Sequence, residues 1–342
     1  MRPARVAAIL ALVAASLLAA GWLLLERWLE TPLAVGAEPA RIEIPRGQPL
    51  AHTARELERR GLLEHARLLA IYASLTRADS KIRAGEYDIP PGTTPRTLLA
   101  LLESGAVVQH SVTIVEGWTF RDLRRALERE PALDNKLAGQ DDAAVMRALG
   151  EPGVHPEGLF FPDTYLFGKD ATDLDILKQA RERMRRELDR AWASREKGVP
   201  LEDSYQALVL ASIVEKETAL SSERARIAGV FTERLRAGMR LQTDPTVIYG
   251  LGPTFDGNLR RPDLERDGPY NTYTRAGLPP TPISLPGAAS LQAAVQPDER
   301  GDLYFVATGE ADGSHTFSRT LAEHNRAVAK YVKRYRQQQK ER

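Results

Sequence analysis

The chain has 342 residues, and its 47 Lys and Arg residues nearly balance 46 Asp and Glu, so the formal net charge is +1. A hydrophobic fraction of 43% and a charged fraction of 27% are those of a globular protein long enough for two or three domains. The balanced charge gives no reason to expect a nucleic-acid partner. The absence of cysteine excludes disulfides, thiolate metal sites and cysteine nucleophiles, and the six histidines lack close metal-ligand spacing. We therefore expect no metal and no cofactor.

The N-terminal segment contains an uncharged apolar run from Val6 to Leu25, which as a helix of about 30 Å matches the hydrocarbon thickness of a bilayer. Arg2 and Arg5 precede the run and charges of mixed sign follow it, which places the N-terminus in the cytoplasm. A signal peptide cleaved near Val35-Gly36-Ala37 is the alternative, but the run is too long and ends too far from that site. The sequence predicts a single-pass protein of the bacterial inner membrane, with residues 1–27 as tail and span and a periplasmic body.

The next segment, residues 28–40, contains turn formers without periodicity and is predicted to be a tether. Three similar units follow, each a short alternating strand, a glycine turn and an amphipathic helix. Units of this kind build the LysM type of carbohydrate-binding module, so we expect a small LysM-like α/β module over residues 41–110. A module that only packs is the alternative. The helices predicted in the three units are Leu50–Arg60, Thr94–Glu103 and Phe120–Glu128.

A larger mixed α+β domain is predicted over residues 111–336, and residues 337–342 are expected to fray. Within it, Met239–Pro286 is poor in periodicity and rich in turn formers, as binding and active-site surfaces often are. The fold class is therefore α+β. The other predicted elements are helices over Asp141–Leu149, Thr172–Lys197, Ile227–Leu235 and Thr320–Arg336, a helix capped by Asp203 or Ser204, and a strand over Leu303–Ala307.

Two carboxylates end the helix that follows Asp203. Leu208–Val214 is a run of apolar or small residues, and Glu215 and Glu217 come directly after it. A Glu at the wall of an apolar site has a raised pKa and can serve as an acid near neutral pH. Residues two apart on a helix point about 200° apart, so these two are not a catalytic pair, and spacing alone does not choose between them. As an alternative, both are helix-end charges paired with neighbouring basic side chains.

The irregular region supplies polar and aromatic side chains of the kind that bind sugars, with rings for apolar sugar faces and amides for hydroxyls. Turn formation explains some of these residues equally well. The residues are Gln242, Thr243, Asp244, Tyr249, Tyr270, Asn271, Thr272 and Tyr273.

Several of these segments together resemble the endolytic murein transglycosylases of the MltG or YceG-like family, and the resemblance covers nearly the whole chain. In that family the catalytic glutamate matches Glu217, which Thr218 follows as in the Glu-Ser or Glu-Thr step of other lytic transglycosylases. Glu215 remains the alternative acid. The segments are Phe161–Thr164, Ile213–Thr218, Leu241–Gly250, Tyr270–Tyr273 and Gly277–Pro280.

The resemblance implies that residues 111–336 form a catalytic domain that cleaves the β-1,4 bond between N-acetylmuramic acid and N-acetylglucosamine inside peptidoglycan strands. No water attacks, a 1,6-anhydro end is left, and elongation of nascent strands would be terminated. Glu217 would act first as acid and then as base. Gln242, Thr243, Asp244, Tyr249, Asn271 and Tyr273 are the expected substrate-binding or supporting residues.

The resemblance also implies partners and leaves rivals. The expected partners are the glycan strands and, near the membrane, penicillin-binding proteins and other peptidoglycan synthases. One rival is a noncatalytic peptidoglycan-binding scaffold anchored in the membrane, in which the glutamates are structural. Another is a hydrolase of the lysozyme type, which would leave reducing ends.

Overall fold

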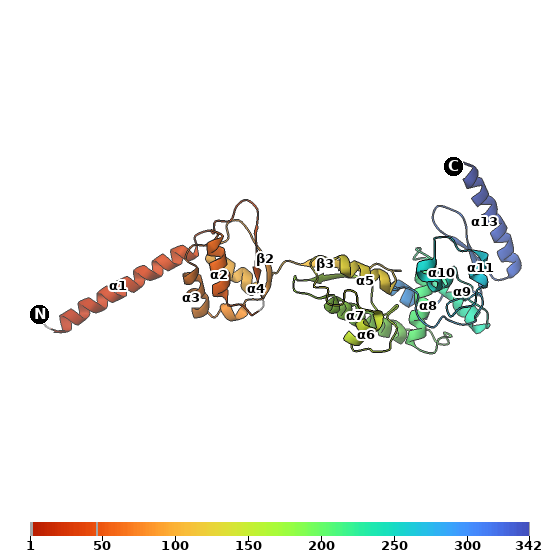
Figure 1. Cartoon of the computed structure of the whole chain (residues 1–342), viewed down its shortest axis with the longest axis horizontal. Helices are drawn as coiled ribbons and strands as arrows, with labels where there is room; N and C mark the ends of the chain where they lie inside the picture. Colours follow the sequence, from red (N-terminus) through yellow and green to blue (C-terminus); the bar gives the residue numbers. More distant parts are fainter. Residues whose placement is uncertain (1–2, 46, 342) are drawn as a thin grey trace. The chain divides into compact units, whose positions relative to one another are not determined.

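The computed structural model describes residues 3–45 and 47–341 and divides into two compact units. One unit contains residues 1–110 and 167–170, and the other contains residues 111–166 and 171–342. Helices predominate in both units, and the strands of the described residues form two-stranded sheets (Figure 1). The mixed α+β fold predicted from the sequence is thus confirmed, whereas a LysM-like identity of the first unit stays a prediction.

The first unit is a small module in which β1 pairs antiparallel with β2, placing Ile42 opposite Tyr87 and Ile44 opposite Gly85. The predicted strand–helix order is present for each strand, but one further helix, α3, follows α2. The elements are α1 (Pro3–Leu29), β1 (Ala40–Ile44), α2 (Leu50–Arg59), α3 (Ala66–Leu75), η1 (Asp79–Lys81), β2 (Gly85–Ile89) and α4 (Pro95–Ser104).

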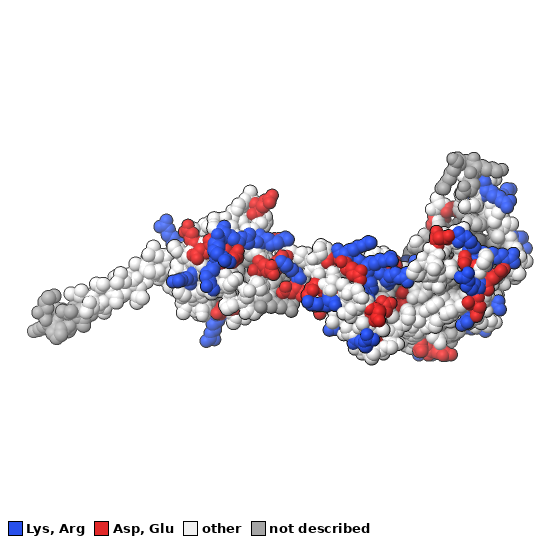
Figure 2. Space-filling view, in the orientation of Figure 1, with Lys and Arg blue, Asp and Glu red and all other residues white. Residues whose placement is uncertain are grey.

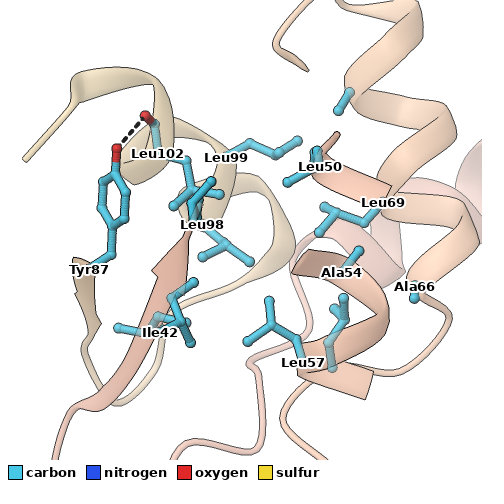
Figure 3. Close-up of a cluster of buried hydrophobic side chains, with 14 of the residues drawn as sticks. Ile42, Leu50, Ala54, Leu57, Ala66, Leu69, Tyr87, Leu98, Leu99 and Leu102 are labelled. Carbon is cyan, nitrogen blue, oxygen red and sulfur yellow. Dashed lines mark hydrogen bonds between the residues drawn. The ribbon is translucent and has the colours of Figure 1, made fainter. Parts of the chain in front are cut away.

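The core of this module lies between α2, α3, α4 and the two strands (Figure 3). Leu50, Ala54 and Leu57 recur at helical spacing along α2 and are buried, which gives this helix a single apolar face. They meet leucines of α3 and α4 in a common cluster. The buried ring of Tyr87 from β2 joins them, and its hydroxyl donates to the carbonyls of Arg83 (2.7 Å) and Leu102 (3.3 Å).

The apolar helix α1 is long enough to cross a membrane over Ala8–Leu29, with a mean hydropathy of 2.4. Figure 2 shows its described length free of charged side chains until it reaches the module. Residues 28–40, predicted as a tether, differ from that prediction: Leu33 is buried in the module core, and Trp28 and Val35 pack against it. Arg96 of α4 also pairs with acidic side chains at the end of α1 and just after it, those of Glu26 and Glu30.

The second unit is built around α8, which packs on α7, α9, α10 and α12. Every residue of α8 from Ala207 to Val214 is buried, so this helix is apolar on all sides. The elements are β3 (His110–Thr113) and its partner β4 (Thr164–Phe167), α5 (Phe120–Arg129), α6 (Asp142–Ala148), α7 (Asp173–Ala193), α8 (Ser204–Glu217), α9 (Arg224–Arg236), α10 (Asp244–Leu251), η2 (Gly252–Thr254), α11 (Arg261–Glu265), α12 (Ala288–Val295), the antiparallel pair β5 (Tyr304–Ala307) and β6 (His315–Ser318), and α13 (Leu321–Glu341).

The region predicted to be irregular contains short helices, α10, η2 and α11, separated by loops. α12 lies beyond it and was also not predicted. α13 continues to Glu341 where fraying was expected from residue 337, and residue 342 lies outside the described residues.

The module core provides a test of packing in the first unit. Leu57→Ala should lower the free energy of unfolding by about 2–5 kcal/mol, because Leu57 is fully buried and its loss leaves a cavity. Urea denaturation of the detergent-solubilised chain would measure it, followed by fluorescence of Trp28 in a background where Trp22, Trp118 and Trp192 are replaced by Phe. Leu75→Ala is the matched control, because Leu75 is 78% exposed and its loss should change little. Equal effects of the two substitutions would contradict the described core.

Candidate functional site

Helix α8 delivers Glu217 to the site as its last residue. The Asp203 carboxylate caps the start of the helix by accepting from the N–H of Gln206 (2.8 Å), as predicted. The Ser212 hydroxyl accepts from the N–H of Ile283 (3.0 Å), which ties the helix to a neighbouring loop. Thr218 is extended, with φ −147° and ψ 138°, so the helix stops directly after Glu217. The packing of α8 therefore fixes Glu217 at the end of a buried helix.

The carboxyl group of Glu217 lies in a desolvated setting with one direct hydroxyl partner. The Thr243 hydroxyl donates to Glu217 Oε1. Burial is the main cause that raises the pKa of Glu217, to about 7, and the nearby charge of Asp244 adds to it. The Thr243 hydrogen bond and the charges of His315 and Arg234 act in the opposite direction. Glu217 can therefore hold a proton near neutral pH and also give it up.

The segment that carries Thr243 is held by the 270–273 loop. The Gln242 N–H donates to the carbonyl of Thr272 (3.1 Å), and the Thr243 N–H donates to the Thr272 hydroxyl (3.1 Å). Thr272 is buried and its hydroxyl also lies 2.9 Å from that of Thr246. Gln242 has a left-handed backbone, with φ 50°, which is uncommon for a residue other than glycine. Hydrogen bonds thus join the segment that carries Thr243 to the 270–273 loop beside Glu217.

Asp244 and Tyr273 form a second pair next to Glu217. The Tyr273 hydroxyl donates to Asp244 Oδ1 (2.6 Å). Burial raises the pKa of Tyr273 well above its usual range, and the Asp244 hydrogen bond and the charge of Glu217 act in the same direction. The phenol is therefore neutral and remains a hydrogen-bond donor. Of the predicted site residues, Thr243, Asp244 and Tyr273 are those that the structure brings to Glu217.

Asn271 serves the loop backbone. Its side-chain Nδ2 donates to three carbonyls at the end of α11, and its Oδ1 accepts from the Tyr273 N–H (2.8 Å). The three carbonyls are those of Asp263 (3.2 Å), Leu264 (3.0 Å) and Arg266 (2.7 Å). Asn271 thus shapes the loop that presents Tyr273, while the side chain of Gln242 is exposed.

Tyr249 lies with a buried carboxyl group that the sequence analysis did not single out. Its hydroxyl donates to Glu157 Oε2 (3.1 Å), and the N–H of Phe120 at the start of α5 donates to Glu157 Oε1 (2.9 Å). Burial is the largest influence on Glu157 and raises its pKa to about 7. The sequence signal was a Glu two residues before the apolar run Leu159–Phe161, and a Glu close to an apolar run is also what drew attention to Glu217.

Glu215 points away from Glu217, as the two-residue spacing predicts. Its side chain is 5% exposed, and Oε2 accepts from the Gly287 N–H (2.9 Å) at the start of α12. Arg224 lies 3.5 Å from Oε1. A Cβ atom on Gly287 would lie 1.8 Å from Glu116 Oε1, so any other residue at this position would require the Glu116 side chain to move. A carboxylate at a helix N-terminus is stabilised by the backbone N–H groups there, which gives Glu215 a structural role.

The described residues contain no group of three or more His, Asp or Glu side chains arranged to hold a metal ion.

Comparisons with known proteins identify relatives over most of the chain. The sequence pattern of the YceG-like family matches residues 42–330. A Bacillus subtilis (strain 168) protein named endolytic murein transglycosylase is 32% identical over 308 residues, covering 85% of this chain and 84% of that protein. A protein of the same name from Streptococcus pneumoniae serotype 2 is 25% identical over 327 residues, and the match spans 58% of that protein's length. A crystal structure of a YceG-like protein from Listeria monocytogenes superimposes with a TM-score of 0.53 at 30% identity, covering 85% of this chain and 99% of that one.

The raised pKa of Glu217 predicts a pH-dependent stability. The folded protein keeps this proton up to about pH 7, whereas the unfolded chain releases it near pH 4.5, so stability falls as the pH rises between these values. Glu217→Gln removes the loss and should be more stable than the parent at pH 8 by about 1–3 kcal/mol, with little difference at pH 4.5. Chemical denaturation at the two pH values would measure this.

Glu215→Gln is the matched control for that experiment. It should be less stable than the parent at pH 8, because Arg224 loses its buried charged partner. A Glu217→Gln variant that is less stable than the parent at pH 8 would contradict the described setting of Glu217.

Proposed function

We propose the reaction of this chain from the premise that it belongs to the YceG-like family, whose pattern matches most of its length. Its curated relatives are named endolytic murein transglycosylases, and the chain is a lytic transglycosylase. Its substrate is peptidoglycan. The specific bond, the products and the roles of the residues are proposals, and they are argued from the geometry around Glu217.

Glu217 is proposed to transfer both protons of the reaction. In its protonated form it donates to the oxygen of the β-1,4 bond between N-acetylmuramic acid and N-acetylglucosamine, and the bond from C1 to that oxygen breaks. The sugar passes through an oxocarbenium-like state. The Glu217 carboxylate then accepts the proton of the C6 hydroxyl as that oxygen bonds to C1, so no water is consumed. The products are a free 4-hydroxyl on one strand and a 1,6-anhydro end on the other.

The observation that carries this proposal is the position of Glu217 at the end of α8, under the Thr243 hydroxyl and with a pKa raised to about 7. An acid with a pKa near the working pH can both give and take a proton, which a single-residue mechanism requires. Glu215 is committed to Gly287 and Arg224, so no second carboxylate on α8 is offered as a nucleophile.

The neighbouring residues are proposed to support the acid and the sugar. Thr243 orients the Glu217 carboxyl group, and the pair formed by Asp244 and Tyr273 offers hydrogen bonds to sugar hydroxyls beside it. Gln242 presents an exposed amide for the same purpose. Asn271 and Tyr249 act less directly, by holding the loop of Tyr273 and the helix α10.

The first unit is proposed to be a LysM-like module that holds glycan. The module has a hollow of about 420 Å³ between the loop after β1 and the segment that leads into β2. Its lining mixes apolar surface with polar side chains, including those of Gln48, Asp79 and Ser80. Polar groups on apolar walls suit a sugar chain.

The cellular setting is proposed from α1. One apolar helix near the N-terminus suits a single-pass anchor in the inner membrane, with the body in the periplasm beside the peptidoglycan. At that place the enzyme would meet nascent strands and end their elongation. Penicillin-binding proteins and other synthases are the proposed protein partners.

Mass spectrometry of uncrosslinked peptidoglycan strands digested by the chain tests the reaction. The parent should release internal fragments with 1,6-anhydro ends, and Glu217→Gln should lower the rate by about 10²–10⁴-fold, because it removes the proton donor and keeps the volume. Glu215→Gln is the matched control and should retain the reaction in the fraction that folds. Reducing ends would indicate a hydrolase, and glycan binding without cleavage by the parent would indicate the scaffold.

Reporter fusions test the proposed orientation. Alkaline phosphatase joined after residue 342 should be active, because it folds only outside the cytoplasm, whereas a green fluorescent protein at the same place should stay dark. Removal of residues 1–27 should leave the body soluble after cell lysis, because the apolar span is then absent. A fluorescent C-terminal fusion would overturn the periplasmic placement.

A further inference from the structure

Arg234 of α9 is a buried arginine whose side chain is committed to backbone carbonyls. The residue is 7% exposed. Its Nε donates to the carbonyl of Leu303 (2.7 Å), and its Nη1 donates to the carbonyls of Leu241 (2.6 Å) and Arg240 (3.4 Å). The guanidinium also lies over the Tyr304 ring, 5.3 Å from its centroid. One side chain thus joins α9, the start of β5 and the segment that leads to α10.

The backbone that Arg234 holds leads directly to the acid. Gln242 comes next, in its left-handed conformation with φ 50°, and its N–H is bound by the carbonyl of Thr272. Such a conformation costs of order 1 kcal/mol and persists only where neighbouring contacts impose it. Thr243 follows, and its hydroxyl donates to Glu217. Arg234 on one side and the Thr272 carbonyl on the other therefore determine where the Thr243 hydroxyl lies.

A guanidinium suits this position because it is planar and presents five N–H donors, so one side chain reaches carbonyls on two sides.

We infer that Arg234 is a positioning residue of the reaction, which fixes residues 240–243 so that the Thr243 hydroxyl meets Glu217. The inference rests on the proposed function of Glu217. Thr243 orients the Glu217 carboxyl group for both proton transfers, so a displaced segment should slow the reaction without weakening the binding of the glycan.

The test measures kcat and KM for anhydro-end formation by the full chain in detergent, on uncrosslinked peptidoglycan strands. Arg234→Gln keeps a donor for one carbonyl only, and we expect kcat per folded enzyme to fall at least tenfold with KM unchanged. Arg234→Lys has one ammonium that cannot donate to carbonyls on both sides, and we expect kcat to be lowered at least threefold with KM unchanged.

Arg236→Gln is the matched control, because Arg236 lies two residues further along α9 and pairs with Glu299 (2.7 Å). It should keep the kcat and KM of the parent. An Arg234→Gln variant that folds and keeps the parental kcat overturns the inference, and so does one whose loss lies in a raised KM. If Arg234→Gln does not fold, Arg234→Lys decides by the same two criteria. A parent without anhydro ends removes the proposed function first, and the inference with it.

Discussion

The burial of α8 is the constraint on which the rest of the site depends. A helix that is apolar on all sides must be surrounded, and α7, α9, α10 and α12 surround it. This packing fixes the position of the last residue of α8 and keeps water away from it. Glu217 reaches the edge of the core at the point where the backbone becomes extended, and the Thr243 hydroxyl meets it there. The chemistry that the site offers follows from this enforced desolvation.

Two glutamates on one helix show how environment divides the same functional group into two roles. Glu215 is nearly inaccessible, yet it has the Arg224 cation and a helix N-terminus as partners, so its charge is matched. Glu217 has one hydroxyl partner and an unfavourable neighbour in Asp244, so its charge is only partly matched. The first arrangement fastens α12 to α8, whereas the second leaves a proton available near neutral pH. In the folded state the charge of Glu217 is therefore less favourable than that of Glu215, and Glu217 is the residue proposed to react.

Helix periodicity was sufficient to predict that Glu215 and Glu217 diverge, and composition was sufficient for the apolar N-terminal helix. The start of α10 was missed because Thr243-Asp244-Pro245 serves equally as a turn and as a helix start, and only the packing of the helix decides. The partners of Asn271 could not be predicted, since backbone carbonyls carry no mark in a sequence. The role of Arg234 was hidden for the same reason. Glu157 could have been predicted by the reasoning used for Glu217, because both residues lie close to an apolar run in the sequence.

The junction between α1 and the first module is short and limits how far the two can move apart. Leu29 ends the apolar helix and is fully buried, Leu33 already belongs to the module core, and only Glu30 to Pro32 lie between them. Arg96 fastens the same junction by pairing with Glu26 and Glu30. With α1 in a bilayer, such a short and clamped junction allows little wandering of the module away from the membrane. A surface held in a thin layer meets strands in that layer at a high effective concentration and meets distant strands rarely. The distance of a glycan strand from the membrane would then determine whether the module meets new or old glycan, before any sugar is recognised.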